Sequence, residues 1–150
     1  MFQRTGDTIV VKATAQQARF LAQIPALLDS VSVEHEDPGY AVLHRPIYLD
    51  EELIDAEVQV FASQEMETQR VIDRSILERT TKERYVMTVE EAGGLLRALN
   101  EARLVLAARA GAFDEGPSWE DRIEEDPSLA AVAWLGYIQG ELIAALTAGV

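Results

Sequence analysis

The last segment of the chain, residues 129–150, is apolar on almost every side when its sequence is placed on a helix. A helix without a polar face belongs either in the centre of a core or across a membrane. The segment contains Gln139 and Glu141 and has no flanking Lys or Arg. Asp126 before Pro127 is a typical helix start, with an N-cap followed by proline at the first helical position. We therefore predict a buried core helix here, the most buried element of the fold.

The charge and the cysteine content restrict the class of protein. The 150 residues include 26 Asp and Glu against 13 Lys and Arg, a net charge of −13, and no cysteine. Without cysteine there are no disulfides, no thiol catalysis and no cysteine-ligated metal. The negative field disfavours nucleic acid and anionic membranes, and the N-terminus lacks the pattern of a signal peptide. We expect one cytoplasmic domain spanning residues 1–150, with no nucleic-acid or membrane partner.

The N-terminal third predicts a hairpin and then a helix. Residues 1–13 contain two short runs on either side of Gly6, which favours a small β-hairpin. Thr14 stands three residues before Gln17, the spacing of a capping box. The helix it starts has an apolar stripe, and Pro25 inside it predicts a kink or a split. The stripe consists of Phe20, Leu21, Ile24, Leu27, Leu28 and Val31.

The middle of the chain is less regular. Asp37 and Pro38 fit a one-turn helix and a turn equally well. Asp50 is the expected start of a second helix, and Ser63 the expected N-cap of a separate third helix that reaches Thr80. The second helix would bury Leu53, Ile54, Val58 and Phe61, the third Met66, Ile72 and Ile76, and Tyr85-Val86-Met87 would be extended. The whole pattern predicts a mainly α fold, a bundle of about five to six helices within residues 14–150 plus the hairpin.

A long helix is predicted from Val89 to Ala110, because Thr88 and Glu91 form a second capping box and Gly111 is a natural C-terminal glycine. On a helical wheel its apolar face contains Ala92, Leu95, Leu96, Leu99, Leu106 and Ala110, while Arg97, Glu101 and Ala108 lie opposite. Arg103 falls in the middle of the apolar face. A guanidinium there needs a carboxylate, backbone carbonyls or water, since a lone buried charge is costly.

Two interpretations of Arg103 follow. The first and favoured one is an internal ion pair with Glu57 or Glu141. Each of these glutamates falls among apolar residues on the face of its own predicted helix. The second is a pocket in which Arg103 binds an anionic ligand. The residues that would shape this pocket or contact a partner are Asn100, Trp134, Tyr137 and Gln139.

Other chemistry receives little support. His35 and His44 lack the spacing of metal ligands, and the acidic stretch 114–126 has Trp119 where a calcium loop needs glycine. No catalytic triad stands out, so we expect no metal, no cofactor and no enzyme activity. The basic residues of 70–84 alternate with acidic ones, as on an exposed salt-bridged helix. Gly93-Gly94 suggests close helix packing.

Two segments carry a family resemblance. Residues 96–111, which include LNEARLVL and end in Arg-Ala-Gly, resemble an LNxxRLxLxxRLG motif, and residues 134–141 resemble a WLGWLQE motif. Pro46-Ile47-Tyr48 and the hairpin-then-helix opening also fit. The family is actinobacterial and is catalogued as a domain of unknown function, numbered two thousand and seventeen. Ala110 replaces its usual leucine, and Gly140 separates Gln139 from Glu141. The resemblance implies a helical cytoplasmic protein with no assigned reaction.

Three hypotheses of function remain. The first is a non-enzymatic interaction or regulatory protein with a protein partner, which could be a second copy. The resemblance adds a link to regulated proteolysis, because family members are often encoded near the N-end-rule adaptor of the Clp protease. The second is a small-anion-binding protein or enzyme with a pocket at Arg103, and the third a DNA-binding regulator that uses residues 70–84. A broad apolar patch favours the first, a pocket at Arg103 the second and a basic stripe the third.

Overall fold

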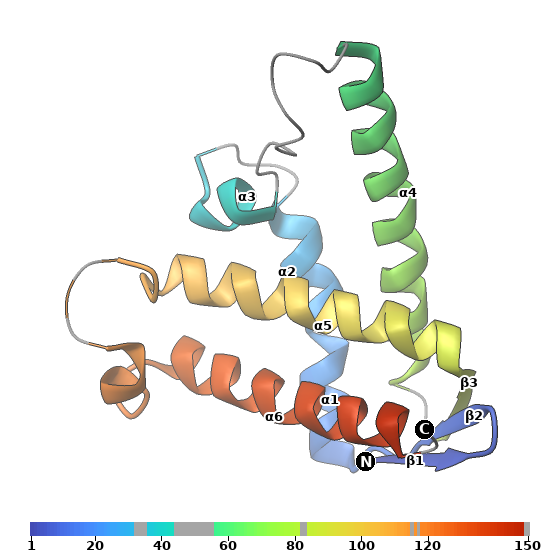
Figure 1. Ribbon diagram of the computed structural model, residues 1–150. Coiled ribbons are helices and arrows are strands. Elements are labelled where there is room, and N and C mark those ends of the chain that lie inside the picture. The colour runs from blue at the N-terminus through green and yellow to red at the C-terminus, as the bar shows by residue number, and fades with distance from the viewer. Residues whose placement is uncertain (32–35, 44–55, 82–83, 115, 117, 149–150) are drawn as a thin grey trace.

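The computed structural model contains six α-helices, one 3-10 helix and three strands among the residues that it describes (Figure 1). The described residues are all except 32–35, 44–55, 82–83, 115, 117 and 149–150. The strands are β1 (Phe2–Thr5), β2 (Thr8–Val11) and β3 (Tyr85–Thr88). The helices are α1 (Ala15–Ala22), α2 (Ile24–Val31), α3 (Pro38–Leu43), α4 (Ala56–Arg79), α5 (Val89–Arg109), η1 (Trp119–Arg122) and α6 (Pro127–Thr147). The predicted mainly α fold with an N-terminal hairpin is confirmed.

The three strands form one antiparallel sheet in the order β1-β2-β3. Gly6 takes a φ of 61° in the turn between β1 and β2, a conformation that glycine adopts at no steric cost. Ile9 of β2 pairs with Met87 of β3, and both side chains are buried in the core. The predicted extended segment at Tyr85 is therefore a third strand beside the hairpin.

The first helical segment is split in two, as Pro25 predicted. The capping box of Thr14 and Gln17 is present at the start of α1, and Pro25 lies in the first turn of α2, where its missing N–H is tolerated. Of the two alternatives for Asp37 and Pro38, the helix is the one that forms. Asp37 Oδ1 accepts a hydrogen bond of 2.8 Å from the N–H of Gly39 at the start of α3.

α5 lies at the centre of the fold, in contact with α2, α3, α4, α6 and the strands β2 and β3 (Figure 1). It begins at the predicted capping box of Thr88 and Glu91. At its other end Gly111 has a φ of 71°, and its N–H bonds Ala108 O at 3.1 Å while Ala112 N bonds Ala107 O at 2.9 Å. These two bonds make a Schellman C-cap, so both predicted ends of the helix are confirmed.

The prediction that the last helix is the most buried element is wrong. α6 runs antiparallel to α5 and buries Leu135, Ile138 and Leu142, but Tyr137 on its other side is exposed (Figure 1). The central position belongs to α5, because its small residues let neighbours approach on several sides. Among the described helices, α6 is the one long and apolar enough to cross a membrane by length and composition, a test that core helices also pass.

α4 is a single helix, so the predicted break at Ser63 is also wrong. Ser63 lies among strong helix formers such as Ala62, Gln64 and Glu65, and the helix continues through a possible cap when its neighbours favour helix. The N-terminal half of α4 extends beyond α5 (Figure 1). Of the inward positions predicted there, Phe61, Met66 and Ile72 are exposed and Ile76 is buried. Leu53, Ile54 and the side chain of Val58 lie outside the described residues.

Candidate functional site

Two ion pairs join α4 to α5. Arg97 donates to both carboxylate oxygens of Asp73, from Nε at 2.9 Å and from Nη2 at 3.0 Å. Arg70 Nε lies 3.3 Å from Glu101 Oε1, and burial raises the pKa of the Glu101 carboxyl even though Arg70 opposes this shift. Arg70 is itself buried, so its predicted place on an exposed helix face is wrong. The wheel put Arg97 and Glu101 opposite the core, on the side of α5 where both pair with residues of α4.

A third ion pair joins α3 to the end of α5. Arg109 binds the buried carboxylate of Asp37 through Nε, at 3.1 Å from both oxygens, and through Nη2. The hydrogen bonds from Arg109 hold the pKa of Asp37 below its usual value, against the opposing effect of burial. Internal ion pairs that fix helix positions, the role favoured for Arg103, are therefore made by Arg70, Arg97 and Arg109.

Arg103 has a different environment. It is half-buried between α5 and α6, and within the described chain it makes no ion pair. Its Nη2 donates a long hydrogen bond of 3.4 Å to Asn100 Oδ1. Glu141, a predicted partner, instead accepts a bond of 3.1 Å from the Tyr137 hydroxyl at the exposed side of α6. The predicted pair with Glu141 is thus wrong, and the side chain of Glu57 lies outside the described residues.

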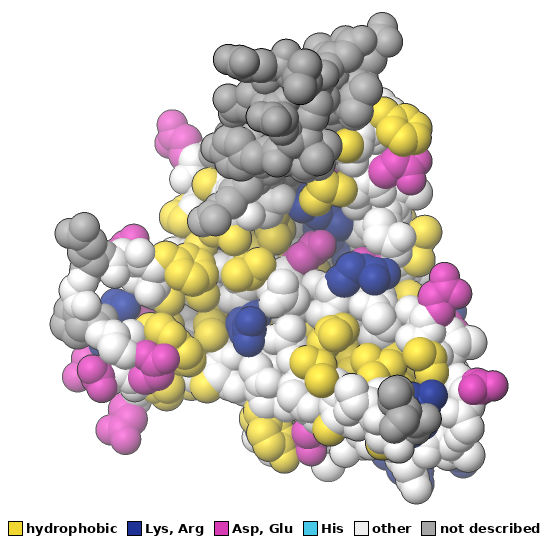
Figure 2. Space-filling model, viewed as in Figure 1, with side chains coloured by type: hydrophobic (Ala, Val, Ile, Leu, Met, Phe, Trp, Pro, Cys, Tyr) yellow, Lys and Arg dark blue, Asp and Glu magenta, His cyan; other side chains and the backbone are white. Residues whose placement is uncertain are grey.

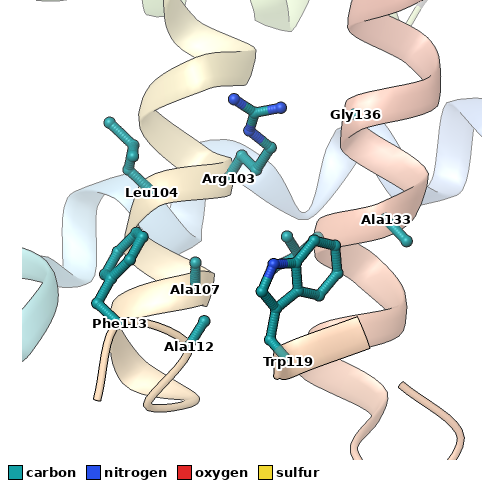
Figure 3. Close-up of a pocket in the computed structure, with 9 residues that line it drawn as sticks. Arg103, Leu104, Ala107, Ala112, Phe113, Trp119, Ala133 and Gly136 are labelled. Carbon is teal, nitrogen blue, oxygen red and sulfur yellow. The ribbon is translucent and has the colours of Figure 1, made fainter. Parts of the chain in front are cut away.

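A cavity of about 470 Å³ opens beside Arg103, between α5, α6 and the segment that connects them. Figure 3 shows the rings of Phe113 and Trp119 on opposite sides of Ala107 and Ala112, with the guanidinium of Arg103 above them. Small residues make this space, because Ala107, Ala112, Ala133 and Gly136 leave it unfilled. The complete lining is Arg103, Leu104, Ala107, Ala112, Phe113, Trp119, Val132, Ala133 and Gly136.

A second hollow of about 470 Å³ continues along the same two helices. It shares Arg103 and Gly136 with the first cavity. We call the two together the α5–α6 groove. The lining of its second half contains more polar side chains and consists of Leu96, Arg97, Asn100, Arg103, Gly136, Gln139, Gly140 and Ile143. Arg103 therefore stands at the junction of an apolar half and a polar half.

Two amide side chains complete the polar half. Gln139 Nε2 lies 3.5 Å from Asn100 Oδ1, the same oxygen that accepts from Arg103. Because Arg103 can only donate, it orients the Asn100 oxygen toward itself, and that in turn orients the amino group of Gln139 toward Asn100. Gln139 Oε1 is then left without a hydrogen-bond partner, although Gln139 is only 7% exposed.

The predicted site residues fall into two groups. Asn100, Arg103 and Gln139 come together in the groove. Trp134 and Tyr137 instead stack on each other at 5.6 Å between ring centroids, and Trp134 lies edge-on to Phe20 of α1 at 6.3 Å. Sequence reasoning missed the cavity walls. The signal for them was the series of small residues Ala133, Gly136 and Gly140 on one side of α6, facing Arg103.

The other kinds of site considered from the sequence, a metal site and a DNA-binding surface, gain no support from the described part of the chain. It has no group of three His, Cys, Asp or Glu residues that could hold a metal ion, and His35 and His44 lie outside it. On the face shown in Figure 2, the basic side chains lie in separate small groups and form no continuous stripe. Arg74 lies 3.7 Å from Asp29 and Arg79 3.5 Å from Glu91, so carboxylates also neutralise the basic residues of α4.

Comparison with known proteins gives one result. No curated protein and no solved structure matches the chain. The family model described as Domain of unknown function (DUF2017) matches residues 1–146. This range includes both motifs on which the resemblance rested and every residue of the α5–α6 groove. The chain therefore belongs to the DUF2017 family.

Proposed function

We propose that this protein is a non-enzymatic binding protein whose α5–α6 groove holds an anionic group against Arg103. The observation that carries the proposal is a half-buried guanidinium, without an ion pair among the described residues, at the junction of an apolar cavity and a polar hollow. A cation in such low-dielectric surroundings attracts an anion more strongly than one in water. No described lining residue is an Asp or Glu that would oppose the anion.

The lining chemistry supports recognition over catalysis. The groove presents guanidiniums, amides, aromatic rings and small aliphatic side chains. These groups bind and orient a ligand, whereas nucleophilic or acid–base catalysis needs a hydroxyl, carboxylate, imidazole, amine or thiol at the reacting atoms. None of the described lining residues supplies one, and the proposal is therefore for a binding protein.

The sequence also raised other hypotheses of function. The ion pairs of Arg70, Arg74 and Arg79 disfavour DNA binding by α4, because an arginine already paired with a carboxylate attracts a phosphate less strongly. A regulatory role is compatible with the groove, since a ligand held between α5 and α6 could alter how either helix meets a partner. The link to proteolysis stays a prediction from the family resemblance.

The test is an NMR titration of the isotope-labelled protein with phenylbutyrate, acetate and inorganic phosphate. We expect at least one of these anions to shift the side-chain signal of Arg103 Nε and the amide signal of Gly136. Arg103→Gln should weaken binding at least about tenfold, as expected for the loss of a charge-assisted hydrogen bond. Arg19→Gln is the matched control, because Arg19 is exposed and lines a different hollow beside α1. Equal binding by both variants, or no binding of any anion, would contradict the proposal.

A further inference from the structure

We infer that the ligand of the α5–α6 groove is a carboxylate joined to an apolar group, with the carboxylate on Arg103 and the apolar group between Phe113 and Trp119. This inference rests on the proposed function and specifies its ligand. Two separate observations support it, one for each end of the ligand.

The apolar end follows from the shape and lining of the cavity. Apart from Arg103, every described side chain that lines it is apolar or is the indole of Trp119. The two rings stand on opposite sides of a floor made by Ala107 and Ala112 (Figure 3). Such a slot accepts a flat or narrow apolar group and offers stacking on either ring. A volume of about 470 Å³ is in the range of small-ligand sites.

The charged end follows from the unused donors of Arg103. A guanidinium has five N–H groups, and within the described chain Arg103 uses one of them, in a long bond to Asn100. Two parallel N–H groups of a guanidinium match the two oxygens of a carboxylate. A phosphate would need more donors and more positive charge, but the second guanidinium of the groove, Arg97, already binds Asp73 with two nitrogens. A monoanionic carboxylate is therefore the better match.

The amide pair supports the same assignment. Asn100 Oδ1 receives two long bonds, from Arg103 at 3.4 Å and from Gln139 at 3.5 Å. Bonds of this length hold the side chains weakly, so Arg103 can turn toward a carboxylate at small cost.

Two kinds of ligand combine a carboxylate with an apolar group. A free aryl or alkyl acid combines a carboxylate with an apolar group, and so does a peptide that ends in phenylalanine. The shared chemistry is the proposal, and the two sources are separate arms of the test. Three small probes define the chemistry: phenylbutyrate has both ends, phenylbutyramide has only the apolar end, and acetate has only the charged end.

We expect calorimetry to give binding of phenylbutyrate that is at least about tenfold tighter than binding of the amide or of acetate. Arg103→Gln should abolish this preference for the acid. Ala133→Leu places a side chain in the cavity, and Phe113→Ala removes one wall at an exposed position, so both should weaken phenylbutyrate and leave acetate unchanged. Arg19→Gln should bind all three probes like the wild type, and circular dichroism checks the fold of each variant.

The outcomes separate the two proposals. If acetate or phosphate binds through Arg103 as tightly as phenylbutyrate, and Ala133→Leu has no effect, the proposed function stands and this inference is wrong. If none of these anions binds, both are wrong. For the source, the tripeptide glycyl-glycyl-phenylalanine is compared with its C-terminal amide. Tight, carboxylate-dependent binding of the tripeptide supports a peptide C-terminus, whereas binding of phenylbutyrate alone supports a small acid.

Discussion

Arg97 of α5 donates hydrogen bonds to both carboxylate oxygens of Asp73 of α4, from Nε to Oδ2 at 2.9 Å and from Nη2 to Oδ1 at 3.0 Å. The Asp73 side chain is 3% exposed, whereas that of Arg97 is 53% exposed. The arginine therefore covers a buried carboxylate from the solvent side. Gln69 Nε2 donates a further bond of 2.9 Å to Asp73 Oδ1. The carboxylate is held in place by groups from both helices.

Removing the arginine should destabilise the protein. Arg97→Ala leaves the buried Asp73 carboxylate with fewer donors, and we expect a loss of about 2 kcal/mol in the free energy of unfolding. This is less than for a fully buried pair, because Arg97 is half in water. Urea unfolding at neutral pH measures the loss. The double variant Asp73→Asn with Arg97→Met should recover part of it, and equal loss in the single and double variants would show that the loss does not come from the stranded Asp73 carboxylate.

Gly94 is required where α4 crosses α5. A Cβ built there would lie 2.8 Å from Asp73 Oδ1 and 2.8 Å from Ile76 Cδ1, so both side chains would have to move to admit it. Gly94→Ala should therefore cost about 1–3 kcal/mol of stability through overpacking. Gly140→Ala is the matched control in α6, where a Cβ meets nothing within 4 Å. It should stabilise the protein by about 0.5–1 kcal/mol, because alanine favours helix over glycine. The same sign for both substitutions would contradict the packing argument.

The capping motifs predicted the positions of helix ends correctly. Thr14 with Gln17, Thr88 with Glu91, and Gly111 each act through hydrogen bonds to their own helix, so local sequence is enough to place the ends of α1 and α5. Ser63 shows the limit of the method, because a side chain able to cap a helix can equally lie inside one.

The arginines of α5 show why the site was harder to predict. A helical wheel separates one apolar face from the rest, but α5 has neighbours on several sides. Arg97, which the wheel put on the polar side, meets Asp73 of α4, while Arg103, which it put on the apolar face, meets Gly136 of α6. The identity of the facing helix decides which arginine is paired, and that depends on tertiary packing.

The ion pair of Asp37 and Arg109 predicts a dependence of stability on pH. Arg109 lowers the pKa of Asp37 in the folded protein, so the ionised carboxylate stabilises the fold at neutral pH. This stabilisation is complete above the unfolded pKa of about 4 and is lost as pH falls through the lower folded value. Asp37→Asn lacks it. We expect the difference in unfolding free energy between wild type and Asp37→Asn to be largest near pH 7 and to shrink below about pH 4.

The control for this pH effect is Asp7→Asn, since Asp7 is an exposed residue of the hairpin turn. Its difference from wild type should be small at every pH. A difference for Asp37→Asn that stays constant from neutral to acidic pH would contradict the prediction, because such a difference could not come from ionisation of the Asp37 carboxyl. Asparagine can still accept the bond from Gly39 N, so that bond is kept in the variant.

The last prediction contrasts Arg103 with Arg109, two arginines on the same helix. Arg109→Ala strands the buried Asp37 carboxylate and should cost about 3 kcal/mol. Arg103→Ala removes a half-exposed guanidinium whose bond, within the described chain, is a long one to Asn100, so it should cost less than about 1 kcal/mol. Thermal melting and urea unfolding of both variants measure the contrast. In the presence of phenylbutyrate the wild type should melt at a higher temperature, because a ligand that binds only the folded state stabilises it. Arg103→Ala should lose this increase, whereas the less stable Arg109→Ala should keep it. A large loss of stability in Arg103→Ala would instead show that Arg103 stabilises the fold. The main observation in favour of anion binding in the groove would then have a structural explanation.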